Sequence, residues 1–416
     1  MEFKQHRLSN GLGIVAECNP SAHSSAIGFF VRAGARDETD DVAGVSHFLE
    51  HMMFKGTPAR SADDVNREFD EMGAHYNAYT SEEHTVYYAA VLPEHQPACV
   101  GLLADILRPS LREEDFAMEK NVIREEIQMY LDQPPYGMDD HVKALCFGDH
   151  PIARSVLGTD ESIAALSVDQ MRDYFAARYE PGMITLAAAG KIDFDALTRQ
   201  IEQVCGGWEP TGVVRDVPPP KPRKRFEAVA IEAATQQYAL VLSGGPDAGD
   251  PGRYAAKLLA TILGDDSGSR MYWDLVDPGL VESCSLGHYE YEGVGMFYTW
   301  LACSPDDIEV NLGRVNQLLA DAVAKPITDA ELSQARNKVK SRVVLGSERP
   351  RSRLFNVGGN WVQGRGYRST ADDLASLDAV TLADLNRVLE RYPLNQAAVV
   401  TVGPRDDVAT PAGYDA

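Results

Sequence analysis

His47-Phe48-Leu49-Glu50-His51 is the stretch from which the fold and chemistry of this chain can be worked out. Residues four apart lie on one face of a helix, so the two imidazoles can bind one divalent metal ion. Glu50 lies next to the second histidine and supplies a carboxylate for proton transfer. This H-x-x-E-H order inverts the H-E-x-x-H motif of many zinc proteases but provides the same groups. The pattern predicts metal-assisted hydrolysis of a peptide bond.

The residues around the motif place it on a helix rather than in a loop. Apolar residues recur at helical spacing, and Gly56-Thr57-Pro58 ends the run. A histidine on such an apolar face is more often a core residue than a ligand. A catalytic metal site also requires a third protein ligand and one open position for water.

A second helix, predicted over residues 116–130, offers candidates for the third ligand. Glu119 and Glu126 are two turns apart and share a face, so one can bind the metal while the other supports the site. Composition alone leaves Glu125 and Glu126 as alternatives. The competing interpretation is that these acids form a solvated helix face.

Composition limits the classes of partner. The 416 residues carry 62 acidic and 39 basic side chains, a net charge of -23. This charge excludes nucleic acid and anionic membrane surfaces as expected partners and favours a basic peptide, although an acidic surface also simply aids solubility. Residues 1–6 lack the apolar core of a secretory signal, and no long apolar run follows, so a cytoplasmic location is expected. The six cysteines lack metal-site spacing and are expected to be reduced and buried.

The chain length predicts two domains. A proline-rich and basic segment, residues 217–225, is the expected linker between a metal-binding domain, 1–216, and a second domain, 226–416. The two halves look like distant copies, because the apolar runs Ala26–Val31 and Tyr238–Ser243 are each followed by a helix pattern. The second of these helices contains no histidine, which predicts a non-catalytic second domain.

Both halves mix strand and helix patterns, which predicts two similar α+β domains. Each is expected to be a mostly antiparallel sheet with helices packed on one face. The strands are expected at Gly11–Ala16, Tyr76–Thr80, Thr85–Val91, Ile184–Ala189, Gly295–Cys303 and Ala397–Val402. The helices are expected at Ala62–Met72, Glu94–Leu107, Glu113–Leu131, Ser167–Ala177, Asp307–Ala324 and Asp329–Leu345.

Several blocks of the chain resemble the pitrilysin-type inverzincin metallopeptidases, in particular the branch that contains mitochondrial processing peptidase. The resemblance spans nearly the whole sequence. It is carried by the blocks 8–12, 44–57, 77–81, 119–130 and 157–159. It implies a clam-like enclosure formed by two similar halves, and a zinc-dependent endopeptidase that acts on short or unfolded peptides held between them.

The resemblance also implies roles for individual residues. Family spacing places the third ligand about 75 residues after the second histidine, and 126 − 51 = 75 selects Glu126. His47, His51 and Glu126 are then the ligands of one Zn²⁺, Glu119 supports the site, and Glu50 takes a proton from the attacking water. The remaining implied residues are those expected to contact substrate, namely Asn77, Ala78 and Phe48. Asn77 and Ala78 lie in a strand expected at a sheet edge, where an extended peptide can pair with it.

One segment departs from the family pattern. Many active relatives carry an Arg and a Tyr in their second half that help to hold substrate, and residues 269–283 lack both at the expected places. The resemblance therefore implies a dimer, with a different homologous subunit as one source of the pair. The alternatives are that the site tolerates the loss, or that Tyr289 or Tyr291 takes the place of the missing tyrosine. The alternative function is a non-catalytic structural or assembly subunit, but such relatives usually have damaged metal motifs.

Overall fold

The computed structural model describes residues 1–133, 135 and 137–411, and this part of the chain forms two compact units. The first unit contains Met1–Gln128, Arg154–Asp216 and Leu345–Arg368. The second contains Met129–Ala153, Val217–Val344 and the described residues from Ser369 onward. Each unit is a sheet packed with helices, so the prediction of two α+β halves is confirmed.

The first unit is built on a six-stranded sheet of order β1-β2-β6-β3-β5-β4, in which only β2 and β6 are parallel. This order leaves β4 at one edge of the sheet, as predicted for the segment that contains Asn77. The strands are β1 Glu2–Arg7, β2 Gly13–Cys18, β3 Ser25–Val31, β4 His75–Thr80, β5 Thr85–Val91 and β6 Ile184–Gly190. The helices are α1 Val45–Met53, α2 Ala62–Glu71, α3 Gln96–Ile106, α4 Glu113–Asp132, α6 Asp160–Ala165, α7 Val168–Arg178, α8 Phe194–Cys205 and α12 Pro350–Val362; α4 continues into the second unit.

The second unit has a five-stranded sheet of order β7-β11-β8-β10-β9. This order repeats β2-β6-β3-β5-β4 of the first sheet strand for strand, including one parallel pair at the same place. The predicted internal repeat is therefore present in the topology. The strands are β7 Phe226–Ala230, β8 Gln237–Gly245, β9 Ser283–Tyr291, β10 Val294–Cys303 and β11 Ala397–Gly403. The helices are α5 Met138–Phe147, α9 Arg253–Gly264, α10 Ile308–Ala324, α11 Asp329–Ser347, α13 Thr370–Ala379 and α14 Leu382–Arg391; α11 runs on into the first unit.

Helices cover both faces of each sheet, which corrects the expectation of helices on one face only. In β3, Ile27 and Phe29 belong to the core beneath α1 and α3, whereas Phe30 belongs to a second core with Leu354 of α12. Gly358 allows α12 to approach, because a Cβ there would lie 2.4 Å from the Phe30 ring. Strands buried on both faces appear in the sequence as continuous apolar runs rather than as alternation.

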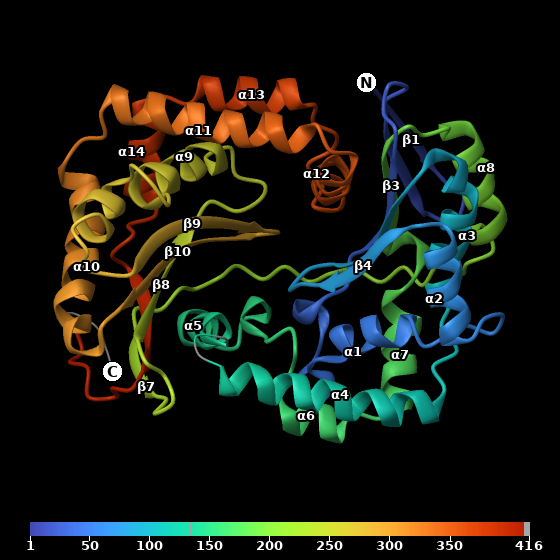
Figure 1. Cartoon of the computed structure of the whole chain (residues 1–416), viewed down its shortest axis with the longest axis horizontal. Helices are drawn as coiled ribbons and strands as arrows, with labels where there is room; N and C mark the ends of the chain where they lie inside the picture. Colours follow the sequence, from blue (N-terminus) through green and yellow to red (C-terminus); the bar gives the residue numbers. More distant parts are fainter. Residues whose placement is uncertain (134, 136, 412–416) are drawn as a thin grey trace. The chain divides into compact units, whose positions relative to one another are not determined.

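Helices α5 and α12, each of which covers one face of a sheet, also correct the predicted domain boundaries. The division at 216/217 is kept, but each half contributes one segment to the other unit. Helix α5 packs on β8 and β11, and α12 packs on β2, β3 and β6 (Figure 1). A linear division into 1–216 and 226–416 is therefore incomplete, because the open face of each sheet is covered by a helix from the opposite half of the sequence.

A buried ion pair fixes α12 on the first sheet. Arg353 donates to both carboxylate oxygens of Glu17 on β2, at 2.9 and 2.5 Å, and Tyr367 donates to the same carboxylate at 2.8 Å. The Arg353 and Glu17 side chains are only 5% and 3% exposed. An isolated buried charge is strongly destabilising, so each partner depends on the other.

Replacing Arg353 with Met is expected to lower the free energy of unfolding by about 3–5 kcal/mol, because Glu17 is left buried without its cation. Urea denaturation measures the change. Lys340→Met, which removes a more exposed ion pair with Asp378, is the control and should cost at most about 1 kcal/mol. The double variant Glu17→Met/Arg353→Met should regain much of the loss. An Arg353→Met chain as stable as the parent would contradict this role.

The cysteines are buried, as the composition predicts. All six lie outside disulfide bonds. Among the described residues, none of the helices combines the length and apolar character needed to cross a bilayer.

Candidate active site

Helix α1 carries both histidines, and its start is fixed by two neighbouring features. Gly44 precedes the helix with a φ of 88°, and a Cβ there would lie 2.6 Å from the Leu157 carbonyl oxygen. Both carboxylate oxygens of Glu38 accept backbone N–H bonds, from Gly44 at 2.7 Å and from Ser46 at 2.8 Å. Burial raises the pKa of Glu38 to about 8, although these two donors oppose the shift. The N-terminus of the helix is therefore held by a buried side chain.

Helix α4 brings a carboxylate to the two imidazoles. Glu126 Oε2 lies 3.8 Å from His47 Nε2 and 3.8 Å from His51 Nε2, and one ligand atom from each of the three residues lies within 4.8 Å of the others. Glu125 points its side chain to a more exposed position and is outside this group. Two imidazole nitrogens and one carboxylate oxygen form the donor set of many catalytic zinc sites, so the three residues fit a divalent metal ion.

Glu119, two turns before Glu126, orients the second histidine. Its Oε1 lies 2.8 Å from His51 Nδ1, and its Oε2 lies 2.5 Å from Lys55 Nζ. A hydrogen bond at Nδ1 leaves His51 Nε2 directed at Glu126. Burial lowers the pKa of His51, but the hydrogen bond and charge of Glu119 outweigh burial and raise it above its ordinary value. Proton binding therefore competes with metal binding at this imidazole.

The side chain of His47 is more buried than that of His51. Burial, with a smaller contribution from His51, lowers the pKa of His47 to about 4. The imidazole is therefore neutral near pH 7, as a metal ligand must be. Its Nδ1 is buried without a hydrogen-bond partner among the described residues.

Glu50 lies beside the donor set and is held by a hydroxyl from β4. Thr80 Oγ1 donates to Glu50 Oε2 at 2.5 Å. Burial raises the pKa of Glu50, while the Thr80 hydrogen bond opposes the shift. A carboxylate whose pKa lies above its usual range is a better proton acceptor, because its basicity is closer to the working pH.

The predicted substrate residues have different environments. Asn77 is exposed on the edge strand β4, and its Oδ1 accepts the backbone N–H of Ala78 at 2.8 Å. Ala78 is buried, with 8% exposure. Phe48 has no exposed surface and stacks on Phe116 at 4.6 Å within the first core. A fully buried ring does not reach a substrate in this conformation, so the assignment of Phe48 to substrate contact is corrected to a core role.

Three residues at the site were not assigned from the sequence: Lys55, Thr80 and Glu38. Lys55 follows His51 by four residues, so helical spacing was the available signal for its place beside Glu119. Thr80 and Glu38 act on α1 through contacts across 30 and 6–8 positions, for which the sequence offers no comparable spacing.

Two family models match the chain. Residues 13–160 match the model described as Insulinase (Peptidase family M16), and residues 165–339 match the Peptidase M16 inactive domain. The first match contains the three proposed metal ligands and the proposed proton acceptor, namely His47, His51, Glu126 and Glu50. The second contains α9, which follows β8 as α1 follows β3 but has no histidine.

Curated relatives match along nearly the whole chain. The uncharacterized zinc protease YmxG of Bacillus subtilis is 32% identical, covering 97% of this chain and 98% of that protein. The uncharacterized zinc protease Rv2782c of Mycobacterium tuberculosis is also 32% identical, with 95% and 92% covered. A probable mitochondrial-processing peptidase subunit beta of Arabidopsis thaliana is 28% identical, with 98% and 79% covered.

Solved structures share the fold. A protease from Helicobacter pylori superposes with a TM-score of 0.89 at 19% identity, covering 97% of this chain and 99% of that one. A putative M16-like peptidase from Alicyclobacillus acidocaldarius gives 0.85 at 25% identity, with 96% and 98% covered. With a repeated sheet topology, an H-x-x-E-H helix and full-length relatives in agreement, the chain belongs to the M16 (insulinase) family of peptidases.

Proposed function

We propose that this protein is a zinc-dependent endopeptidase that hydrolyses peptide bonds in short or unfolded peptides. The observation that carries the proposal is the convergence of His47, His51 and Glu126, from α1 and α4, next to the carboxylate of Glu50. The names of the curated relatives as zinc proteases support the choice of zinc.

Each residue of the site has a defined task in this proposal. His47 Nε2, His51 Nε2 and a Glu126 oxygen hold the ion, and Glu119 keeps the His51 ring in the orientation that binding requires. When bound, zinc supplies Lewis-acid activation of water and of the scissile carbonyl. Glu50 accepts the proton of the attacking water through Oε1 and passes it to the departing amine.

Substrate recognition is proposed at the edge strand β4. An exposed strand edge has unpaired backbone groups that bind an extended peptide largely regardless of its sequence. Asn77 lies exposed on this edge and is the side chain proposed to contact substrate. The net charge of -23 favours basic peptides over acidic ones.

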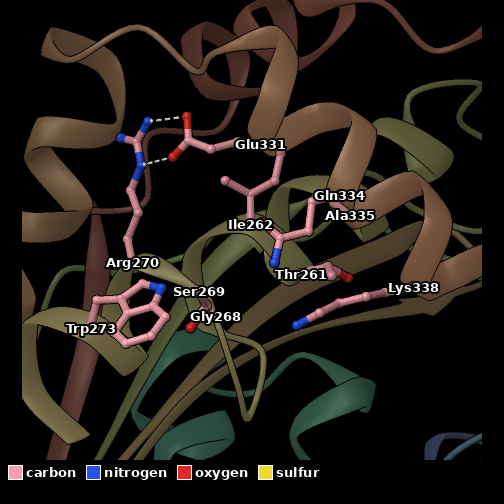
Figure 2. Close-up of a pocket in the computed structure, with 10 residues that line it drawn as sticks. All are labelled: Thr261, Ile262, Gly268, Ser269, Arg270, Trp273, Glu331, Gln334, Ala335 and Lys338. Carbon is pink, nitrogen blue, oxygen red and sulfur yellow. Dashed lines mark hydrogen bonds and ion pairs between the residues drawn. The ribbon is translucent and has the colours of Figure 1, made fainter. Parts of the chain in front are cut away.

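We also propose that the protein forms a dimer in which a different homologous subunit supplies the missing Arg/Tyr pair. The support comes from the second unit. Arg270 lies in the segment where the family resemblance places the substrate-holding pair, but its guanidinium binds the carboxylate of Glu331 at 2.7 and 3.1 Å (Figure 2). It also donates to the carbonyl oxygens of residues 325 and 326. Arg270 is thus engaged within its own unit, which supports the supply of the missing pair by another chain.

Digestion of a quenched fluorescent peptide by the isolated chain tests the proposed function. Cleavage should stop when zinc is removed by a chelator and return when zinc is added back, and mass spectrometry of the products identifies the bond that is cut. Bound zinc is measured by elemental analysis of the same sample. A chain that binds zinc but cleaves only after a homologous subunit is added supports the dimer. A chain that fails to cleave with any such subunit favours the non-catalytic assembly role.

Replacing Glu119 with Gln is expected to weaken zinc binding by about 10–100-fold, because the His51 imidazole loses its charged partner. Competition with a chromogenic chelator measures the affinity. Glu114→Gln, at a solvent-exposed position near the start of the same helix, is the matched control and should bind zinc like the parent. Equal affinities for the two variants would show that Glu119 does not support the site.

A further inference from the structure

We propose that Thr80 is a positioning residue that fixes the orientation of the Glu50 carboxylate. The inference rests on the proposed peptidase function and names a residue that acts through the proton acceptor rather than on the substrate. It is carried by a contact between two different elements, the edge strand β4 and the helix α1.

The geometry assigns the two carboxylate oxygens different tasks. Thr80 Oγ1 donates to Glu50 Oε2 at 2.5 Å, a short distance typical of a hydroxyl bound to a carboxylate. Because Oε2 is held by this bond, we assign proton transfer to Oε1. A carboxylate held by a single fixed donor loses less conformational freedom when it reacts.

The backbone of Thr80 is anchored, so its hydroxyl has little freedom to follow Glu50. Thr80 is the last residue of β4 and pairs with Thr85 of β5. The connecting turn is closed by Ser81, whose backbone N–H donates to the His84 carbonyl at 2.8 Å. The short 3-10 helix Ala35–Asp37 holds this turn. The Ala35 N–H donates to the Ser81 carbonyl oxygen at 3.2 Å, and the Arg36 N–H donates to the Glu82 carbonyl oxygen at 2.9 Å.

Buried ion pairs reinforce the same turn. Arg36 Nη1 lies 2.5 Å from Glu83 Oε1, and both side chains are at most 1% exposed. Arg215 binds Asp37 through two hydrogen bonds, at 2.9 and 2.7 Å, and also donates to the Glu83 carbonyl. Breaking one buried partner is costly, so the turn after Thr80 is a rigid support.

Strand β4 therefore contacts both the proposed substrate and the proton acceptor Glu50. The edge of β4 is where we propose that the peptide backbone pairs, and its last residue holds Glu50. The peptide and the proton acceptor are then aligned by a common element. Loss of the Thr80 hydroxyl should disturb the reaction step more than the binding of peptide.

Thr80→Val and Thr80→Ser test this role, because valine keeps the shape without the hydroxyl and serine keeps the hydroxyl. In the peptide assay, Thr80→Val should lower kcat by about ten- to a hundredfold, the effect of losing one hydrogen bond to a charged group. KM, bound zinc and Tm should stay near the parent values, and Thr80→Ser should recover most of kcat. Thr401→Val, which makes the same change at a buried threonine of β11 in the second sheet, is the matched control and should leave kcat at the parent value.

Crystal structures of the zinc-loaded parent and Thr80→Val give a readout that does not depend on activity. The parent should show one Glu50 orientation, with Oε2 on Thr80, and the variant a rotated or split carboxylate. An unchanged Glu50 in Thr80→Val, an unchanged kcat, or a loss of zinc or of Tm that accounts for the drop would overturn the inference. If the parent cleaves no peptide, either alone or with a homologous subunit, the proposed function fails, and the crystal comparison still decides whether Thr80 orients Glu50.

Discussion

Replacing Glu50 with Gln is expected to abolish peptide hydrolysis while zinc remains bound. Glu50 is outside the donor set of His47, His51 and Glu126, so its loss leaves all three ligands in place. Glutamine has nearly the same shape and can still accept the Thr80 hydroxyl, but it cannot take a proton. Because a positioned general base contributes about 10²–10⁴-fold, kcat should fall by at least this range. The measurements are kcat on a quenched peptide and zinc per chain by elemental analysis.

The contrast with His51→Ala makes the result specific. That variant removes a ligand and should lose both zinc and activity, whereas Glu50→Gln should lose activity alone. Unfolding temperatures of the two variants check that the fold is kept. If Glu50→Gln retains peptidase activity, proton transfer must be assigned to another group; if it loses zinc, Glu50 supports metal binding instead.

Local spacing explains why the histidine pair could be predicted from the sequence. Residues four apart on a helix meet regardless of how that helix packs, so His47 and His51 were fixed by the motif. Glu125 and Glu126 are adjacent, and the choice between them depends on the rotation of α4 against α1. That rotation is set by packing, in which Ile123 and Ile127 are buried and Glu125 stays exposed. The residues therefore left two candidates, and only family spacing selected between them.

The exchange of α5 and α12 had no comparable local signal. The apolar run Ala26–Val31 is typical of a strand buried on both faces, but the prediction placed helices on one face of the sheet only. An amphipathic helix shows which of its own sides is apolar but not which sheet receives that side. Leu354 and Val357 of α12 contact β-strands more than 300 residues earlier, so only the folded chain reveals the pairing.

Thr80 illustrates the same limit at the site. Its strand and the edge position of that strand were predicted, and both were found. The hydroxyl reaches Glu50 only because β4 passes beside α1, which the sequence of either element does not state. Residues that bind a metal can be recognised from their side-chain type and spacing. Residues that orient those ligands can be recognised only from their position in the folded chain.

Replacing Glu126 with Gln is the second change with a large expected effect. A neutral amide oxygen is a much weaker ligand than a carboxylate for a dication, and only the two imidazoles would remain as strong donors. Since losing a partner of a ligand already costs about 10–100-fold in metal affinity, losing the ligand should cost more than about 100-fold. Zinc should be lost on dialysis, and peptidase activity should disappear with it. Competition with a chromogenic chelator gives the affinity.

Glu125→Gln is the control that the chain itself provides. It makes the same chemical change one residue away, on the same helix, at a side chain outside the donor group. Its zinc content and kcat should match the parent, because α4 keeps Glu126 at 3.8 Å from both imidazole nitrogens. The reverse pattern, in which Glu125→Gln loses zinc and Glu126→Gln retains it, would mean that α4 is rotated in the metal-bound protein. The two carboxylates differ by about 100° around one helix, so the pair of variants tests that rotation directly.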